Sequence, residues 1–314
     1  MRYQMTYKEF TIPSSNGKQD LFCWVMEPSG PPERIIQLVH GLGCHSGRYR
    51  YIAQKLCEAG ALVCANDHVG HGQTALSSDT FGRTFGDWRI FPEDEHRLHQ
   101  TVTQRYPQLP YGMFGHSMGS MIARAYAAMY PEDGLKALAL GGICQQNPGA
   151  DVLLTKKEIP DLMAEGLGHD MELGGRYFGV LMEKANVRFP GEDASAWLCR
   201  DLSVRTDYAN DPLNNHTGNA LEMLFAFLEM YRFTTDPAND AKIPTGLPLL
   251  LMAGDQDPCG NYGEGLYNAV NSLINTGHKA RCIAFSGYRH EIHNHPALRE
   301  RFLQELTKFF RDNM

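Results

Sequence analysis

Short apolar runs alternate along this chain with longer segments in which apolar side chains recur at helical spacing. The runs that read as buried strands cover residues 35–39, 61–65, 111–114, 135–140, 247–253 and 281–285. Helical spacing is found over residues 47–59, 93–106, 118–130, 219–233, 262–275 and 296–310. Because the runs lack polar alternation and are separated by helices, they predict an α/β fold with a mostly parallel central sheet and helices on both faces.

The first thirty residues show a different pattern, with alternating polar and apolar positions over 7–12 and 20–26. A cluster of turn-forming residues, Ser14, Ser15, Asn16 and Gly17, separates the two segments. This arrangement predicts an amphipathic β-hairpin ahead of the parallel sheet.

The alternation of strands and helices is interrupted after Cys144 and resumes near residue 218. Residues 145–217 contain helical fragments, many glycines and charged residues, and no strong strand pattern. The following segment, 219–233, is apolar nearly all round, so a helix there must be covered on several sides. We therefore expect a discontinuous core, residues 1–144 and 218–314, with an inserted helical cap over residues 145–217.

Candidate chemistry centres on the segment Gly115–Gly119, which reads G-H-S-M-G between an apolar run and a helical pattern. A serine in G-x-S-x-G at a strand-to-helix turn projects its hydroxyl from the top of the sheet, and the glycines permit the tight reversal. The sequence therefore predicts Ser117 as a nucleophile. The alternative is a glycine-lined turn whose serine only caps a helix.

A serine nucleophile needs a base, and the base needs an acid that holds its tautomer. In the chain order typical of this motif, the acid and the histidine follow later strands. The loop after residues 247–253 contains Asp255 and Asp257, and the loop after 281–285 contains His290. We favour Asp257 as the acid because it lies further into its loop, with Asp255 as the alternative, and His290 as the base.

Acyl transfer also requires hydrogen-bond donors for the oxyanion of the tetrahedral intermediate. The backbone N–H of Met118 follows the nucleophile at a helix N-terminus and is one candidate. The loop after residues 35–39 reads His-Gly-Leu-Gly, and its small residues allow close approach of the backbone to a substrate. We assign the second donor to the N–H of Leu42.

Metal-dependent chemistry is the less favoured alternative. The spacings among His290, His293 and His295, three and five, differ from the four of a zinc-binding H-E-x-x-H helix. A site among the remaining loop histidines is conceivable from the residue types alone; these are His40, His45, His68, His71 and His116. We expect neither a metal nor another cofactor.

Composition restricts the partners and the compartment. The net charge is −7 without a basic cluster, which argues against nucleic acid. No apolar run approaches the ~20 residues that span a bilayer, and the N-terminus lacks the apolar segment of a secretory signal. The eight cysteines stand singly, which favours buried thiols in a reducing cytoplasm over a disulfide framework.

Taken together, four segments make the chain resemble the monoglyceride lipase and lysophospholipase group of the α/β-hydrolase superfamily. They are HGLGCHSGRY (40–49), DHVGHGQT (67–74), GHSMG (115–119) and RHEIHN (289–294). The resemblance implies an α/β-hydrolase fold and a Ser117, Asp257 and His290 triad with oxyanion donors at Leu42 and Met118, and His116 also matches the group. Two departures are Cys44, where the group usually has Glu, and Thr74, where Ser is common.

The resemblance further implies a serine hydrolase that cleaves small or lipid-like carboxylic esters, such as monoacylglycerols or lysophospholipids, through an acyl-enzyme. An amidase or peptidase, a thioesterase and an aryl-ester esterase use the same triad. A ligand sensor without turnover is the alternative from another class. The sequence leaves the oligomeric state open and allows at most transient membrane-surface contact through the cap.

Apolar residues of the cap and of the following helix predict a tunnel for the substrate, although ordinary packing of the cap on the core explains them equally well. They are Met163, Met171, Phe178, Met182, Trp197, Met223, Phe225, Phe227 and Met230. Four glycines, Gly166, Gly168, Gly174 and Gly175, are expected to let part of the cap move as a lid.

Overall fold

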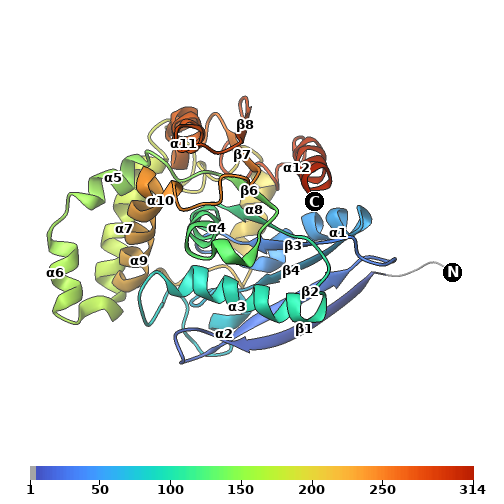
Figure 1. Ribbon diagram of the computed structural model, residues 1–314. Helices are drawn as coiled ribbons and strands as arrows, with labels where there is room; N and C mark the ends of the chain where they lie inside the picture. The colour runs from blue at the N-terminus through green and yellow to red at the C-terminus, as the bar shows by residue number, and fades with distance from the viewer. Residues whose placement is uncertain (1–4) are drawn as a thin grey trace.

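The computed structural model describes residues 5–314 and contains one eight-stranded sheet (Figure 1). Residues 1–4 of the segment examined for a secretory signal lie outside the described part. The strands are β1 (Thr6–Pro13), β2 (Asp20–Glu27), β3 (Arg34–Val39), β4 (Ala61–Asn66), β5 (Tyr111–His116), β6 (Ala137–Gly141), β7 (Leu249–Gly254) and β8 (Ala280–Phe285). Their order across the sheet is β1-β2-β4-β3-β5-β6-β7-β8.

Strand direction separates the hairpin from the rest of the sheet. β1 and β2 pair antiparallel with each other, and β2 is antiparallel to β4, whereas all the other neighbours are parallel. The register aligns Val39 with Gly115 and His116 with Gly141. The loops after the central strands therefore leave the sheet at one edge, where α/β proteins place their sites.

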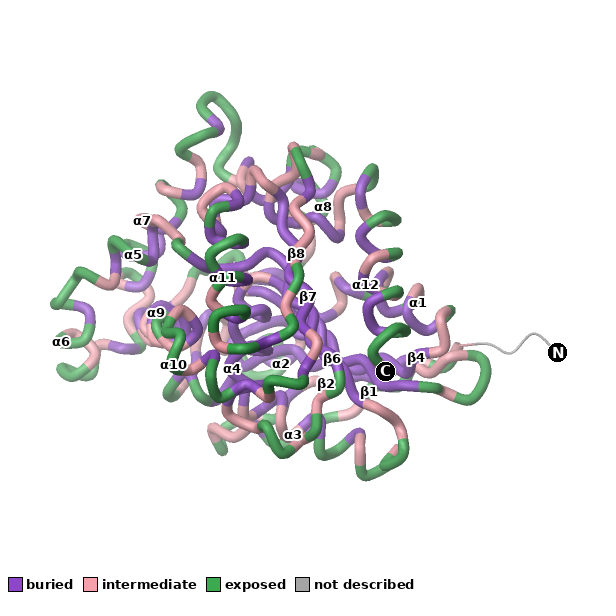
Figure 2. Tube along the Cα trace, turned by 45° about the horizontal axis from the view of Figure 1, so that its top comes forward, coloured by how far each residue is buried: buried purple, intermediate pink, exposed green. Residues whose placement is uncertain are grey.

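Helices cover both faces of the sheet and confirm the predicted fold class. The α-helices outside residues 145–217 are α1 (Arg50–Glu58), α2 (Gly72–Leu76), α3 (Ile90–Arg105), α4 (Met118–Met129), α9 (Leu221–Thr235), α10 (Pro237–Asp240), α11 (Glu264–Asn275) and α12 (Arg299–Asn313). One face packs Trp24 and Ile36 against α1 and α12, and the other packs Met113 against α3 and α4. The central strands are buried along their length, as the continuous purple of the sheet in Figure 2 shows.

Four of the predicted helices begin two or three residues later than expected, at Arg50, Leu221, Glu264 and Arg299, and two of these shifts have local reasons. The segment 47–59 starts with a 3₁₀ turn, Ser46–Tyr49, before α1. The segment 262–275 starts at Glu264, because Asn261 and Tyr262 have positive φ angles of 45° and 57° and end a preceding turn, Pro258–Gly263. Such angles are incompatible with a right-handed helix.

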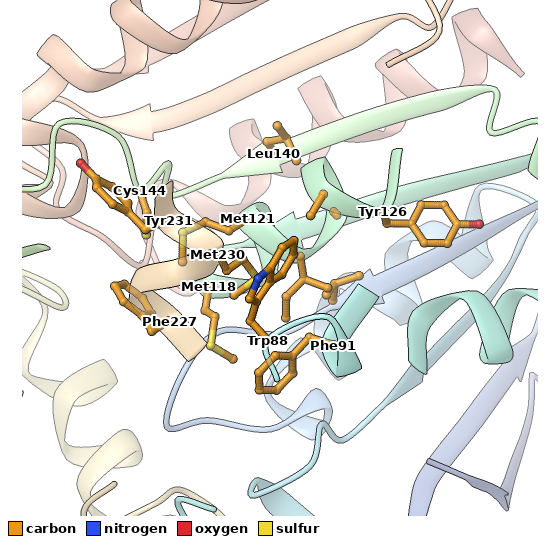
Figure 3. Packing of buried hydrophobic residues seen from close by; sticks show 14 of the residues in the cluster. Trp88, Phe91, Met118, Met121, Tyr126, Leu140, Cys144, Phe227, Met230 and Tyr231 are labelled. Atoms are coloured by element: carbon orange, nitrogen blue, oxygen red, sulfur yellow. The ribbon is translucent and has the colours of Figure 1, made fainter. Parts of the chain in front are cut away.

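The segment expected to form a cap is helical in the structure. It contains α5 (Pro148–Leu154), α6 (Glu158–Ala164), α7 (Met171–Ala185) and α8 (Leu202–Asn210), and no strand is assigned to it. The apolar helix α9 lies between α4 of the core and α7, which explains why it is apolar nearly all round. Figure 3 shows Phe227, Met230 and Tyr231 of α9 packed with Met118 and Met121 of α4. The division at residues 144 and 218 stays a prediction.

Within residues 5–314, no helix combines the length and the apolar character that are needed to cross a bilayer.

Candidate active site

Ser117 occupies a strained position between β5 and α4. Its φ and ψ angles are 59° and −126°, an arrangement that L-residues rarely adopt and that is found mostly where function requires it. A methyl group on Gly115 would lie 2.1 Å from the carbonyl oxygen of Gly119. One on Gly119 would lie 2.1 Å from the carbonyl oxygen of Val39. Both glycines are therefore required sterically by the turn that exposes Ser117.

His290 is joined to Asp257 beneath the same edge of the sheet. Its Nδ1 lies 2.8 Å from Oδ2 of Asp257, and both residues are at least 98 % buried. The second carboxylate oxygen of Asp257 accepts a hydrogen bond from the N–H of Cys259 at 2.9 Å. The competing carboxylate, Asp255, instead accepts the N–H of Gly287 at 2.7 Å. The structure thus pairs the predicted base with Asp257 rather than with Asp255.

The nucleophile and the base are not joined directly in the structure. Within residues 5–314, no hydrogen bond joins the Ser117 hydroxyl to the imidazole. In free enzymes, such contacts are often long and tighten only in the substrate complex. His116, which precedes Ser117, donates from Nε2 to the carbonyl oxygen of His290 at 3.1 Å. The nucleophile segment and the histidine loop are therefore connected through a neighbouring side chain.

The electrostatic environment singles out one histidine of this cluster. Burial lowers the pKa of His290, but the adjacent carboxylate of Asp257 outweighs burial and raises the pKa above its usual value. Burial and neighbouring histidines lower the pKa of His116 well below the usual range, and burial lowers the pKa of His293 to about 4. Among these three histidines, His290 is therefore the one whose pKa is raised rather than lowered.

The backbone N–H groups of Leu42 and Met118 remain available for an oxyanion. Neither N–H has a hydrogen-bond partner among the described residues, and Met118 is the first residue of α4. The carbonyl oxygen of Gly43 accepts the hydroxyl of Tyr208 at 3.0 Å and the N–H of Asn215 at 2.9 Å. Residues of the predicted cap thus hold the loop that contains Leu42.

The loop histidines His40, His68 and His71 hydrogen-bond mainly to the backbone. Nε2 of His40 accepts the N–H of His68 at 3.0 Å, and Nε2 of His68 donates to the carbonyl oxygen of His40 at 3.1 Å. Nδ1 of His71 donates to the carbonyl oxygen of Val69 at 2.9 Å. In the described chain, the groups with metal-ligand spacing are His96–His99–Asp133 and Asp257–Cys259–His290.

The two departures from the resembled pattern have defined contacts. The hydroxyl of Thr74 donates to the carbonyl oxygen of Asp67 at 2.7 Å and accepts the N–H of Phe22 at 2.8 Å. The thiol of Cys44 donates to the carbonyl oxygen of Gly41 at 3.3 Å, and burial raises its pKa to about 12. Both residues therefore act as neutral hydrogen-bonding groups beneath the site.

A cavity of about 390 Å³ opens above Ser117 between the core and the predicted cap. Of the apolar residues expected to form a tunnel, Phe178, Met182, Trp197 and Phe227 line it. The other residues of that set do not line the cavity. Two of them, Met223 and Met230, are fully buried because α9 directs them toward the hydrophobic core, as Figure 3 shows for Met230. None of the lining side chains that the structure describes carries a formal charge.

Glycines of α7 shape this cavity. Gly175 and Gly179, one helical turn apart, both line it, and a methyl group on either would meet no atom within 4 Å. Gly174 has a different role, since a methyl group there would lie 2.0 Å from the carbonyl oxygen of Asn219. Gly174 and Gly175 thus lie inside a regular helix, which argues against them as hinges. Lid motion at Gly166 and Gly168 stays a prediction.

The sequence interpretation missed an ion pair beside the site. Arg48 and Glu291 lie on separate loops, and their side chains meet at 2.6 Å with exposures of 8 % and 5 %. Arg48 also packs over the ring of Tyr208 at 4.9 Å. Glu291 directly follows His290 in the sequence. A charged residue next to the predicted base was the signal that could have indicated a buried ion pair.

The chain is similar in sequence and in structure to known hydrolases. The model of the family "Serine aminopeptidase, S33" matches residues 30–297. A monoglyceride lipase of Rattus norvegicus is 38 % identical over 243 residues, which is 76 % of this chain and 70 % of that protein. A thermostable carboxyl esterase from Bacillus coagulans, solved with glycerol, has 39 % identity and a TM-score of 0.93, and 99 % of each chain is covered. A lipase in an open form has 32 % identity and a TM-score of 0.91, with 98 % of this chain and 99 % of that one covered.

Proposed function

The chain belongs to the serine aminopeptidase S33 family of α/β-hydrolases and is a carboxylic ester hydrolase, and on this basis we propose that Ser117, Asp257 and His290 are its catalytic triad. The observation that carries the assignment is the buried 2.8 Å contact of His290 with Asp257. The strained Ser117 faces the cavity, and its neighbour His116 hydrogen-bonds to the carbonyl oxygen of His290. Because Nδ1–H donates to Asp257, the Nε2 atom of His290 is free to accept a proton.

In the proposed mechanism, Ser117 Oγ attacks the ester carbonyl carbon while Nε2 of His290 takes the hydroxyl proton. The carbonyl oxygen becomes negative and is stabilised by the N–H groups of Leu42 and Met118. His290 then returns the proton to the alkoxide, so that the alcohol leaves and an acyl-enzyme on Ser117 remains. Water, deprotonated by the same imidazole, releases the carboxylic acid and regenerates Ser117.

The absence of charge in the described cavity lining supports an uncharged substrate, and we propose a monoacylglycerol. The lining combines apolar side chains such as Phe178 with neutral polar ones such as Asn215 and Tyr208. A lysophospholipid would bring a charged head group, and an aminopeptidase substrate would bring an ammonium group. Burying either without a partner is costly. A neutral glycerol ester with an apolar acyl chain avoids this cost.

Residues 145–217 are proposed to form the cap that covers this substrate. The contacts of Tyr208 and Asn215 with Gly43 support that role, because they join the segment to the loop of Leu42. A cytoplasmic location is proposed from the eight free cysteines, six of which are buried. Exposed apolar side chains of this segment, among them Val152 and Met182, support transient contact with lipid surfaces.

The test is hydrolysis of three matched substrates by the wild type and by Ser117→Ala. We expect turnover of a monoacylglycerol, and much lower kcat/KM for a lysophosphatidylcholine of the same acyl chain and for an aminoacyl anilide. Ser117→Ala should lose about 10⁴-fold or more in kcat and all labelling by a fluorophosphonate. Ser29→Ala, an exposed serine, is the control. An active Ser117→Ala would refute the nucleophile, and preference for a charged substrate would refute the substrate assignment.

A further inference from the structure

A second group of potential ligands lies at the opposite end of α4 from Ser117. His96 and His99 are three residues apart on one face of α3, and Asp133 lies in the turn after α4. Ser117 precedes the twelve residues of α4, which span roughly 18 Å. In Figure 3, Tyr126, which contacts Asp133, lies on the far side of the cluster from Cys144, a lining residue of the cavity.

The two imidazoles converge on a single carboxylate oxygen of Asp133. Oδ2 of Asp133 is 2.6 Å from Nδ1 of His96 and 3.4 Å from Nδ1 of His99, and all three ligand atoms lie within 4.8 Å of one another. For metal–ligand bonds of about 2.0–2.1 Å, neighbouring ligands of a tetrahedral ion are about 3.4 Å apart. The contact of His99 already has this separation. The contact of His96 would lengthen, and its side chain is 18 % exposed.

An unpartnered nitrogen points into the same group. His99 is 7 % exposed, and its Nδ1 is buried without a hydrogen-bond partner among the described residues. Leaving a buried polar atom in this state is unfavourable.

Neighbouring aromatic groups support a fixed arrangement of these ligands. The ring of Tyr130 stacks on His96 with centroids 4.1 Å apart, and the edge of Tyr111 packs against His99 at 4.5 Å. The hydroxyl of Tyr126 donates to Oδ2 of Asp133 at 2.5 Å. Metal-bound carboxylates are commonly held by such a second hydrogen bond.

We infer that His96, His99 and Asp133 bind a divalent transition-metal ion of the zinc type, with water completing the coordination. Two imidazoles and one carboxylate are ligands that suit zinc. The ion joins α3 to the turn after α4, and its distance from Ser117 gives it a structural role outside ester hydrolysis. The site is therefore independent of the proposed catalytic function.

The experiment titrates chelator-treated protein with Co²⁺ and follows the visible absorption. We expect one equivalent with tetrahedral d–d bands and no thiolate charge-transfer band. His99→Gln and Asp133→Asn should each lose the bands, and His169→Gln, an exposed histidine on the predicted cap, should keep them. Zn²⁺ should raise the Tm of the wild type and of His169→Gln by several degrees, and not that of the two site variants.

Several results would overturn the inference. One is the absence of d–d bands in the wild type, and another is unchanged bands in His99→Gln and Asp133→Asn. A thiolate charge-transfer band that disappears in His290→Asn would place the ion at Asp257–Cys259–His290 instead, where it would also inhibit hydrolysis. If a site variant does not fold by circular dichroism, His96→Gln at the more exposed ligand replaces it and must lose the bands as well.

Discussion

Arg48 Nη2 donates hydrogen bonds of 2.8 and 2.6 Å to the two carboxylate oxygens of Glu291, the residue that follows His290. Burial raises the pKa of Glu291, but Arg48 outweighs it and the net pKa is lowered. Arg48→Met removes one partner of this buried pair. We expect a loss of about 3–5 kcal/mol in the free energy of unfolding at pH 7, measured by urea denaturation.

The pH dependence of this loss has a defined sign. A carboxyl group with a lowered folded pKa stabilises the fold above its unfolded pKa, and this stabilisation is lost as pH falls. The difference between the wild type and Arg48→Met should therefore shrink as the pH falls below 4.5, the ordinary pKa of a Glu side chain. Arg50→Met, at a side chain that is 55 % exposed, serves as the control and should stay within about 0.5 kcal/mol of the wild type. An equal loss in both variants would contradict the role of the pair.

Ester hydrolysis should fall at acidic pH with a midpoint above 6.5. The base must be neutral to accept the proton of Ser117, and the pKa of His290 is raised by Asp257. The lowered pKa values of His116 and His293 keep these neighbours neutral through this range. The measurement is kcat/KM from pH 5 to 9 with an uncharged ester, whose own ionisation then contributes nothing. A flat profile between pH 5 and 8 would argue against His290 as the base.

Gly119→Ala should strongly reduce activity by displacing the turn around Ser117. The added methyl group would lie 2.1 Å from the carbonyl oxygen of Val39, so that β3 and α4 cannot keep their separation. We expect at least a 10²-fold loss of kcat, on the order of the effect of removing one oxyanion donor. Gly246→Ala, where a methyl group meets no atom within 4 Å, is the matched control. Equal activity of the two variants would show that the close approach of Gly119 to Val39 is not required for catalysis.

Gly179→Leu should shorten the acyl chains that the enzyme accepts. Gly179 lines the cavity and has open space around its Cα, so a leucine side chain would occupy volume available to the substrate. We expect kcat/KM to fall about tenfold or more for long-chain monoacylglycerols and to change little for short-chain ones. Gly179→Ala controls for helix propensity and should stabilise α7 by about 0.5–1 kcal/mol. An equal decrease for all chain lengths would contradict the assignment of the cavity.

The sheet, the turn at Ser117 and the loop positions of the site residues could be predicted from the sequence because each depends on residues that are close together in the chain. Apolar runs separated by helical spacing predicted the parallel sheet, since strands buried on both faces need no polar alternation. The pattern Gly115–Gly119 predicted the turn at Ser117 because adjacent residues determine its backbone geometry. The loop positions of Asp257 and His290 followed from the order of strands along the chain. The catalytic roles of these residues stay predictions.

Tertiary structure decided whatever depends on residues distant in the chain. The choice between Asp255 and Asp257 required the actual path of both loops. The two carboxylates are only two residues apart in the sequence, but Asp257 contacts His290 whereas Asp255 accepts the N–H of Gly287. The pairing of Arg48 with Glu291 spans 243 positions and has no periodic signal. The cavity, its uncharged lining and the meeting of His96 and His99 with Asp133 arise only when helices pack, since packing determines which faces converge.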